Sequence, residues 1–359
     1  MKILVLTHEF PPVGGGGGRV AQDICRGLAK QGHEIVVITS RLKGLPRDDS
    51  VDGIRVIRVP SLRREAFRAG LLTMGAYILS GLWVSFCLKS RWRPEIIHVH
   101  FAVPSGALAW ILSRMTGIPY VLTAHLGDVP GGAPEKTGRW FRWIFPFTRP
   151  IWRDAAKVTA VSEFTRQLAL KHYTVDIKVI HNGVDLKKLD PEEIELQTPP
   201  RIIFAGRFML QKNPIQIIET LAKLKDIPWQ CVMLGDGPLY NVVEAEIKYH
   251  GLGERFALPG WVTSDEVIDW FSKSDILFMP SLSEGLPVVG VQALAMGLAM
   301  VVSDIGGFID LVDNKKNGFL INSENGNSFR QRLAELLVNH EKLLAFRNAS
   351  RAKAQQFDL

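Results

Sequence analysis

The stretch DILFMPSLSEGLPVVGVQALAMGLAMVVSD, residues 275–304, decides the fold of the second half of the chain. Its two ends, DILFMP and AMVVSD, are short apolar runs typical of buried strands. The segment between them predicts a loop followed by a helix with Pro287 in its first turn. Two buried strands joined by a helix form a parallel unit. Glu284 in the loop and Gln292 in the helix are polar side chains in mostly apolar or small sequence, so they require an explanation.

The same alternation of apolar runs and helical segments extends along the whole chain. In the first half it predicts strands at 2–7, 34–40, 54–59, 95–100, 119–125, 157–162 and 177–182, and helices at 20–31, 67–89, 105–116 and 163–172. In the second half it predicts strands at 201–206, 229–235, 255–260, 275–280, 299–304 and 318–322. Near-continuous apolar strands separated by helices indicate parallel sheets covered on both faces.

A charged, proline-rich segment, HNGVDLKKLDPEEIELQTPP, interrupts this pattern and is typical of a domain linker. The sequence therefore predicts an α/β protein with two doubly wound Rossmann-like domains. We expect an N-terminal domain over 1–183, a linker over 184–200, a C-terminal domain over 201–340 and a final helix over 341–359.

The composition excludes several classes of protein. The 359 residues are 47% hydrophobic and 22% charged, which is globular. Cys25, Cys87 and Cys231 are widely spaced and form no CxxC pair, so a reducing compartment is expected, without a disulfide or zinc framework. The opening MKILVLTHEF has the pattern of a strand and not of a signal peptide. These features predict a cytoplasmic protein.

The net charge of +7 comes largely from basic residues in the first half: Arg63, Arg64, Arg68, Lys89, Arg91, Arg93, Arg139, Arg142, Arg149 and Arg153. They can form a solvated basic surface, or they can meet an anionic membrane or phosphorylated ligands. Residues 69–88 carry no charge and are long enough to span a membrane. Because basic residues flank this segment on both sides, we favour a buried helix that touches the inner membrane surface over a true span. No nucleic-acid partner is expected.

Ligands of open α/β sheets bind just beyond the carboxyl ends of the strands, so two such domains place a cleft between them. The first strand is followed by five glycines, Gly14–Gly18, and then by a helix. Glycine lets backbone N–H groups approach a ligand, and a helix start behind such a turn favours an anion. The second predicted strand ends in Thr39 and Ser40 and not in an acid, which disfavours a dinucleotide dehydrogenase.

Four turns of the second half carry candidate ligand residues. Arg207 and Lys212 follow its first strand and suit a diphosphate, although they can also be solvated surface cations. Asp236 in LGDGP is expected to cap the next helix. Trp261 in LPGWV can flank a flat base or simply pack. Glu284 can accept hydrogen bonds from a hydroxylated ligand or cap its helix electrostatically.

His125 follows a buried strand of the first half, a position from which an imidazole can hydrogen-bond a substrate. His98 and His100 lie inside a predicted strand and are interpreted as satisfied core groups. No further ligand pattern accompanies them, so a zinc site is unsupported.

Taken together, the chain resembles the retaining glycosyltransferases of family 4 (GT4), which have the GT-B fold. The resemblance covers nearly all of the chain and rests on motifs in a specific order: the glycine-rich turn, HVHF, TAHLGD, VSEFTR, HNGVD, GRFMLQKNP, LGDGP, PGWV and PSLSEGLPVVGVQALAMGLAMVVSDIGG. It implies a nucleotide-sugar donor held mainly by the C-terminal domain, and no metal cofactor.

The resemblance also implies individual roles. Arg207 and Lys212 would bind the diphosphate with support from the amides of Gly285, Leu286, Val288 and Val289 around Pro287, and Glu284 would bind donor-sugar hydroxyls. Gly235, Gly260 and Trp261 would lie near the turn that holds the base, Gly15 and Gly16 would close over the phosphates, and His125 would contact the donor sugar. The acceptor hydroxyl would attack from the side of the leaving phosphate, with retention of configuration.

Two features depart from the family pattern. Gln292 stands where relatives usually have a second glutamate, which binds the ribose, and the chain ends where relatives usually continue into a helix that returns toward the first domain. The first departure leaves open a catalytically silent protein that binds a nucleotide sugar or a partner transferase. An epimerase acting on a UDP-sugar is a third reading. The basic, apolar first half favours a lipid-linked or cell-envelope glycan as the acceptor.

Overall fold

The computed structural model describes residues 1–359 except 67–68, 133–140, 190, 192 and 323–325, and the side chains of Arg91, Phe141 and Arg142 are also outside it. Arg68, Arg139 and the predicted helix start at Phe67 therefore lie outside the described residues. The chain divides into two compact units, residues 1–181 and 182–359. The finer division into domains, linker and final helix stays a prediction.

The first unit contains an eight-stranded sheet in the order β3-β4-β2-β1-β5-β6-β7-β8, in which β3 is antiparallel to its neighbour and the other pairs are parallel. Its strands are β1 (Lys2–Leu6), β2 (Glu34–Leu42), β3 (Asp48–Val51), β4 (Ile54–Arg63), β5 (Ile96–His100), β6 (Tyr120–Ala124), β7 (Lys157–Ala160) and β8 (Ile177–Val179). Seven of them match predicted strands. The edge strand β3 was missed because DDSV is short and mostly polar.

Helices of the first unit are α1 (Gly16–Lys30), α2 (Leu71–Arg91), α3 (Ala107–Thr116), α5 (Phe141–Arg153) and α6 (Glu163–Leu170), with short turns η1 (Ala102–Gly106) and η2 (Leu126–Asp128). Helix α5 was missed because Pro146 and Pro150 lie inside it, and proline normally ends a helix. Helix α6 begins where expected, since the Ser162 hydroxyl accepts a hydrogen bond from the Thr165 amide.

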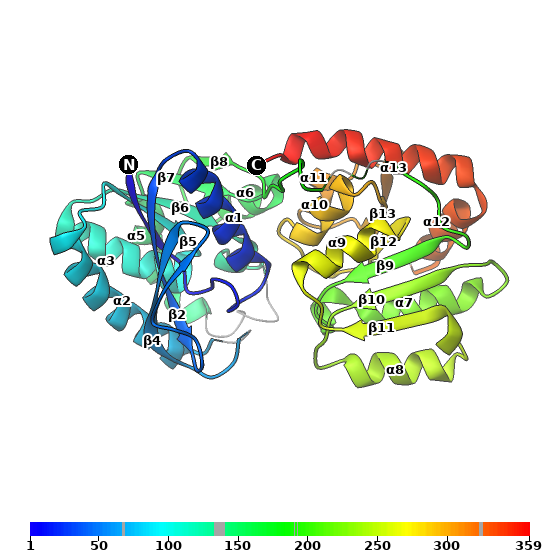
Figure 1. Ribbon diagram of the computed structural model, residues 1–359, viewed down its shortest axis with the longest axis horizontal. Coiled ribbons are helices and arrows are strands. Elements are labelled where there is room, and N and C mark those ends of the chain that lie inside the picture. The colour runs from blue at the N-terminus through cyan, green and yellow to red at the C-terminus, as the bar shows by residue number, and fades with distance from the viewer. Residues whose placement is uncertain (67–68, 133–140, 190, 192, 323–325) are drawn as a thin grey trace. The chain divides into compact units, whose positions relative to one another are not determined.

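The second unit is a six-stranded parallel sheet in the order β11-β10-β9-β12-β13-β14, with helices over both faces (Figure 1). Its strands are β9 (Arg201–Ala205), β10 (Gln230–Leu234), β11 (Phe256–Gly260), β12 (Ile276–Met279), β13 (Ala299–Ser303) and β14 (Gly318–Ile321). Its helices are α7 (Pro214–Leu221), α8 (Tyr240–Tyr249), α9 (Ser264–Ser272), α10 (Val288–Ala295), α11 (Phe308–Leu311), α12 (Gly326–Val338) and α13 (His340–Ala354), with a short turn η3 (Leu210–Lys212). Two doubly wound parallel α/β sheets confirm the predicted fold class.

The segment after residue 181 is bound into the second unit by a buried ion pair. Arg347 on α13 donates to Asp275 Oδ1 at 2.6 Å and to the Glu195 carbonyl. The Gln197 amide donates to the same Asp275 carboxylate. Burial raises the pKa of Asp275 and lowers that of Arg347, and the opposite charge of each partner offsets part of this cost of burial.

Candidate functional site

The order of the second sheet reverses between β9 and β12, which are hydrogen-bonded neighbours. Loops that leave the carboxyl ends of two such strands face one crevice, where α/β sheets bind ligands. Here the loops are also joined to each other. The Gln211 side chain donates to the Ser283 carbonyl at 2.9 Å, and the Leu282 amide donates to the Gln211 carbonyl at 2.8 Å. The candidate residues of both loops are therefore held together.

Lys212 and Glu284 are in direct contact across this crevice. The Lys212 ammonium donates to Glu284 Oε1 at 2.5 Å, and the two side chains are 17% and 7% exposed. Arg207 lies half-buried at the start of the same β9 loop. The structure thus places two predicted cations in one loop, with a carboxylate from the β12 loop already bound to one of them.

The backbone around Glu284 is fixed by two glycines that follow β13. The Gly307 amide donates to the Glu284 carbonyl at 3.2 Å. A Cβ on Gly306 would lie 1.8 Å from the Glu284 carbonyl oxygen, and one on Gly307 would lie 1.8 Å from that of Gly285. Only glycine allows this close approach, so the SDIGG turn packs directly against the backbone of the Glu284 loop and fixes its position.

Asn182 supports the same loop from the other side. Its side-chain amide donates to the Leu286 carbonyl at 2.8 Å, while its buried Oδ1 has no hydrogen-bond partner within the described part of the chain. Asn182 belongs to the HNGVD motif, but the sequence alone assigned it no role. Its place in that motif was the signal that could have identified it.

Helix α10 begins one residue later than predicted. Pro287 has φ −69° and ψ 123°, so it is the residue before the helix and not part of its first turn. Among the described residues no hydrogen bond is donated by the amides of Gly285, Leu286, Val288 and Val289. Free amides at a helix start are suited to an anion. Gln292 is half-buried on the next turn of this helix.

The LGDGP turn packs against the β9 loop. Gly235 has φ +130°, and a Cβ there would lie 2.0 Å from the Gly206 carbonyl oxygen, so glycine is required. Asp236 does not cap α8 as predicted, because that helix starts at Tyr240. Instead, Asp236 Oδ1 accepts a hydrogen bond from the Gly237 amide at 2.6 Å.

The LPGWV turn forms the end of β11. The Gly260 carbonyl accepts a hydrogen bond from the Gly235 amide at 2.8 Å, which joins this turn to LGDGP. Trp261 follows with 59% of its surface exposed, so the packing alternative does not account for most of its indole. An exposed aromatic face at a strand end suits a flat ligand group.

In the first unit Gly14 and Gly15 precede α1, as predicted, whereas the other three glycines of the run form its first turn. Gly15 precedes the helix, and Gly16 is its first residue. The Gly15 amide donates to Glu9 Oε2 at 3.2 Å, so a carboxylate of the chain already lies at this helix start. A Cβ on Gly17 would lie 2.4 Å from the Phe101 ring, so this glycine is required by packing.

His125 lies directly after β6 and is buried. Its ring stacks on Phe101 with centroids 4.4 Å apart, and its Nε2 is 3.4 Å from His100 Nδ1. The Asp128 carboxylate accepts hydrogen bonds from the amides of His125 and Ala102, both at 2.8 Å. Burial lowers the pKa of His125 to about 3 and raises that of Asp128 to about 7. His125 is therefore a neutral hydrogen-bonding group at neutral pH.

The two strand histidines differ from each other. His98 Nε2 is 2.9 Å from the Thr123 hydroxyl, as expected for a satisfied core group. The expectation for His100 is wrong in part, because its Nε2 is buried without a hydrogen-bond partner among the residues that the structure describes. Phe101, at φ +71°, and Asp128 were not selected from the sequence. The HLGD spacing after β6 was the available signal for Asp128.

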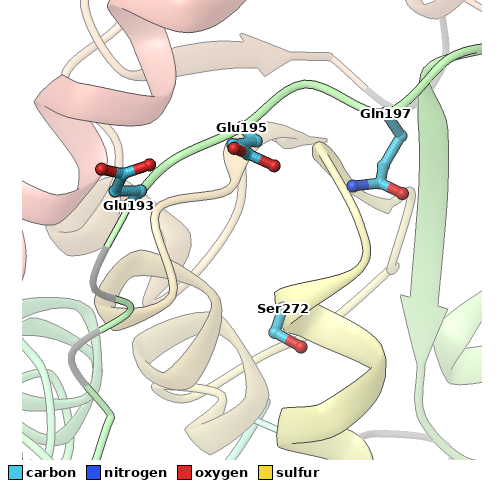
Figure 2. A pocket seen from close by; sticks show the side chains of 4 residues that line it. All are labelled: Glu193, Glu195, Gln197 and Ser272. Atoms are coloured by element: carbon cyan, nitrogen blue, oxygen red, sulfur yellow. The ribbon is translucent and has the colours of Figure 1, made fainter.

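A hollow of about 420 Å³ lies elsewhere in the second unit, lined by Glu193, Glu195, Gln197 and Ser272 (Figure 2). Gln197 and Ser272 adjoin the amino ends of β9 and β12. This is the sheet edge opposite the Lys212–Glu284 contact, so the hollow is not the crevice described above. No group of three metal-ligating side chains gathers within the described ranges.

Comparisons with known proteins agree with this geometry. Residues 14–188 match the model of Glycosyltransferase Family 4, and residues 187–353 match that of Glycosyl transferases group 1. The putative teichuronic acid biosynthesis glycosyltransferase TuaC of Bacillus subtilis is 31% identical over 258 residues, 69% of this chain and 61% of the relative. The Escherichia coli UDP-Gal:alpha-D-GlcNAc-diphosphoundecaprenol alpha-1,3-galactosyltransferase is 28% identical, covering 96% of this chain and 89% of the relative.

Among solved structures, Anabaena Alr3699/HepE in complex with UDP and glucose matches with a TM-score of 0.79 at 19% identity, covering 100% of this chain and 96% of the other. At that identity the likeness supports the fold alone. The two family models adjoin each other and together span nearly the whole sequence. The chain is a member of the GT4 glycosyltransferases of GT-B fold, which transfer a sugar from a nucleotide sugar.

Proposed function

We propose that this transferase moves a hexosyl group, with retention, from a UDP-sugar to a hydroxyl of a lipid-linked or cell-envelope glycan. A GDP-sugar is the alternative donor. The observation that carries the proposal is the Lys212–Glu284 contact at the point where the second sheet reverses. It combines a cation for phosphate with a carboxylate for sugar hydroxyls in one crevice.

The second unit would hold the donor. Lys212 and Arg207 would bind the diphosphate, helped by the free amides at the start of α10. Glu284 would accept hydrogen bonds from the sugar hydroxyls. Trp261 would lie against the base, beside the turns of Gly235 and Gly260, and Gln292 would bind the ribose through its amide oxygen.

Chemistry in this arrangement would consist mainly of stabilising the leaving group. As the bond from the sugar carbon to the phosphate oxygen breaks, negative charge grows on the diphosphate, where the two cations and the amides are placed. The acceptor oxygen forms the new bond on the same face, and its proton passes to the departing phosphate. No metal is needed in this scheme. His125 and the Gly15–Gly16 turn of the first unit would contact the donor as neutral groups.

Two relatives support the acceptor class. The names of the B. subtilis and E. coli relatives refer to teichuronic acid biosynthesis and to a diphosphoundecaprenol-linked sugar. Undecaprenol is a long-chain lipid alcohol, so the second name describes a lipid-linked sugar as acceptor. A cytoplasmic enzyme at the inner face of the membrane fits such an acceptor, and the UDP-Gal in the second name favours a UDP-sugar.

The test is a donor panel. Thermal shift with UDP, GDP and their sugar conjugates identifies the base, and radiolabelled conjugates then report transfer to a polyprenyl-diphosphate sugar. We expect stabilisation by UDP and formation of a labelled lipid. A protein that binds UDP but neither hydrolyses nor transfers any labelled sugar would be the catalytically silent alternative, for which Gln292 is the motivating residue.

A further inference from the structure

Helix α2 carries apolar side chains on its outer face as well as on the face that packs on the first unit. Its buried positions are Tyr77, Gly81 and Ser85. Gly81 approaches closely enough that a Cβ would lie 2.7 Å from the Leu108 side chain. The tyrosine hydroxyl donates to the Ile38 carbonyl at 3.2 Å. Ile78, Leu82, Val84 and Leu88 are partly buried and pack against the same core, so the inner face accounts for only part of the apolar surface of the helix.

The outer face is made of large apolar side chains. These are Leu72 (84% exposed), Leu79 (72%), Trp83 (73%) and Phe86 (52%), which we name the α2 stripe. At 100° per residue they fall within about 60° of one another, opposite the buried positions. A helix that borders water normally has polar or charged side chains at such outward-facing positions.

No charged residue interrupts the helix between positions 71 and 88, and α2 is long and apolar enough to cross a membrane. Within the described residues it is the one helix that meets this criterion, and 22% of its most apolar window is buried. The buried helix expected from the sequence is correct only for one face. Because that face packs on the first unit, a membrane span would have to pull it out of the core.

Charge is confined to the two ends of the helix. Arg64 before it and Arg93 after it are exposed, with Lys89 half-buried between. Glu65 and Glu95 are the exposed acids next to these cations. An uncharged apolar stripe with cations at both ends matches a bilayer interface, where apolar groups enter the acyl boundary and cations meet anionic headgroups.

We propose that the α2 stripe docks the first unit on an anionic membrane surface, with α2 lying in the plane of the interface. The occupant is lipid. The proposal gives the lipid-linked acceptor a physical location and rests on the proposed function in that respect, but binding to lipid requires no sugar transfer. It can therefore fail while the transferase chemistry stands.

Cys87 provides a reporter at the edge of the stripe. It is exposed, whereas Cys25 and Cys231 are buried. Burial also raises the pKa of Cys25 to about 12 and raises that of Cys231, which leaves both thiols unreactive. An environment-sensitive fluorophore on Cys87 is expected to shift to the blue with vesicles of equal phosphatidylglycerol and phosphatidylcholine. An unchanged spectrum would overturn the proposal.

Flotation with the same vesicles tests the residues. Leu79→Gln with Trp83→Gln should reduce the vesicle-bound fraction at least tenfold, and phosphatidylcholine alone should bind the wild type several-fold less. The matched control is Tyr249→Gln with Val338→Gln, two exposed apolar side chains of the second unit that should leave flotation unchanged. Donor hydrolysis in water, measured on every variant, reports folding and catalysis independently of docking.

Two outcomes would replace interfacial docking with another arrangement. A wild-type dimer in solution that becomes monomeric in the Leu79→Gln, Trp83→Gln variant, with no flotation of either, would make the stripe a contact between two copies. Resistance to alkaline carbonate extraction would make α2 a spanning helix. Release by carbonate together with the tenfold loss in the variant is the result that supports interfacial docking.

Discussion

The Lys212 ammonium and the Glu284 carboxylate are 2.5 Å apart, although 72 positions separate them in the sequence. Both side chains are mostly shielded from water. In the free protein the cation of the β9 loop is therefore already partly neutralised by the β12 loop. A ligand that brings both phosphate and hydroxyl groups can replace this internal contact with one bond to each partner, so we expect the pair to favour sugar diphosphates over ligands that carry only one of the two groups.

The losses caused by removing Lys212 and by removing Glu284 should not be independent. Lys212→Met should reduce turnover more than tenfold, because leaving-group stabilisation is lost and Glu284 keeps an unpaired charge. Glu284→Gln should also slow transfer. We expect the double variant to lose less than the product of the single effects, measured as kcat/KM. Lys223→Met, an exposed lysine of the same unit, is the control, and additive losses would exclude functional coupling of the pair.

Arg207 is predicted to act on the same leaving group from the other end of the β9 loop. Arg207→Ala should lower kcat more than tenfold with a smaller change in KM, since charge on the phosphate grows in the transition state. Single-turnover rates with labelled donor measure this directly. Near-normal rates in both Arg207→Ala and Lys212→Met would remove the diphosphate assignment.

Much of the fold could be predicted because buried parallel strands have a strong local pattern. The runs that became β9, β10, β12, β13 and β14 are apolar and mostly buried, so packing agrees with the sequence pattern there, whereas the edge strand β11 is half-exposed. The exceptions have local causes. Strand β3 pairs through its backbone while its side chains stay polar, and α5 forms despite two prolines.

The site could be predicted only as far as strand ends locate it. Position after a strand identified Glu284, Lys212 and His125, but not the contacts among them. The Lys212–Glu284 bond depends on sheet order, which a pattern of apolar runs does not contain. Likewise, Glu9 reaches the start of α1 through a turn whose geometry has no simple sequence signature.

Gln292 offers a test of the ribose role that does not depend on turnover. Gln292→Glu should tighten UDP binding modestly, by about 1 kcal/mol, because a carboxylate accepts a stronger hydrogen bond from a hydroxyl than an amide does. Calorimetry on wild type and variant measures the difference. Weaker binding by the variant would count against a contact between this residue and the ribose.

Asp128 is expected to position His125 without touching the donor. The Asp128 carboxylate accepts hydrogen bonds from two backbone amides. In Asp128→Asn the side-chain NH₂ group would face one of these donors, and this lost hydrogen bond should destabilise the first unit by about 1–3 kcal/mol. Transfer should also slow, with kcat affected more than KM. Asp128→Glu, which keeps the carboxyl group, should be less stable than wild type but should retain more of kcat than Asp128→Asn. Equal kcat in Asp128→Asn and wild type would limit this residue to a structural role.

Buried histidines should make the protein less stable in acid. Burial lowers the pKa values of His8 and His98 to about 4 and that of His125 to about 3, against an ordinary value near 6.5. Between about pH 6.5 and 4 the unfolded chain therefore binds more protons than the folded one, and stability falls as the pH falls. Asp128 opposes this, because its pKa, raised to about 7, lets the folded form bind a proton first.

Burial also lowers the pKa of His100, so the histidines outnumber the two opposing carboxyls, Asp128 and Asp275. The free energy of unfolding should therefore fall by about 1.4 kcal/mol or more per pH unit between pH 6 and 4.5. Urea unfolding at several pH values measures this slope. His98→Gln, whose amide can still hydrogen-bond the Thr123 hydroxyl, should reduce the slope. His340→Gln, at an exposed position, should leave it unchanged. A stability that is flat or rises toward pH 4.5 would show that the histidine cluster is hydrated in solution.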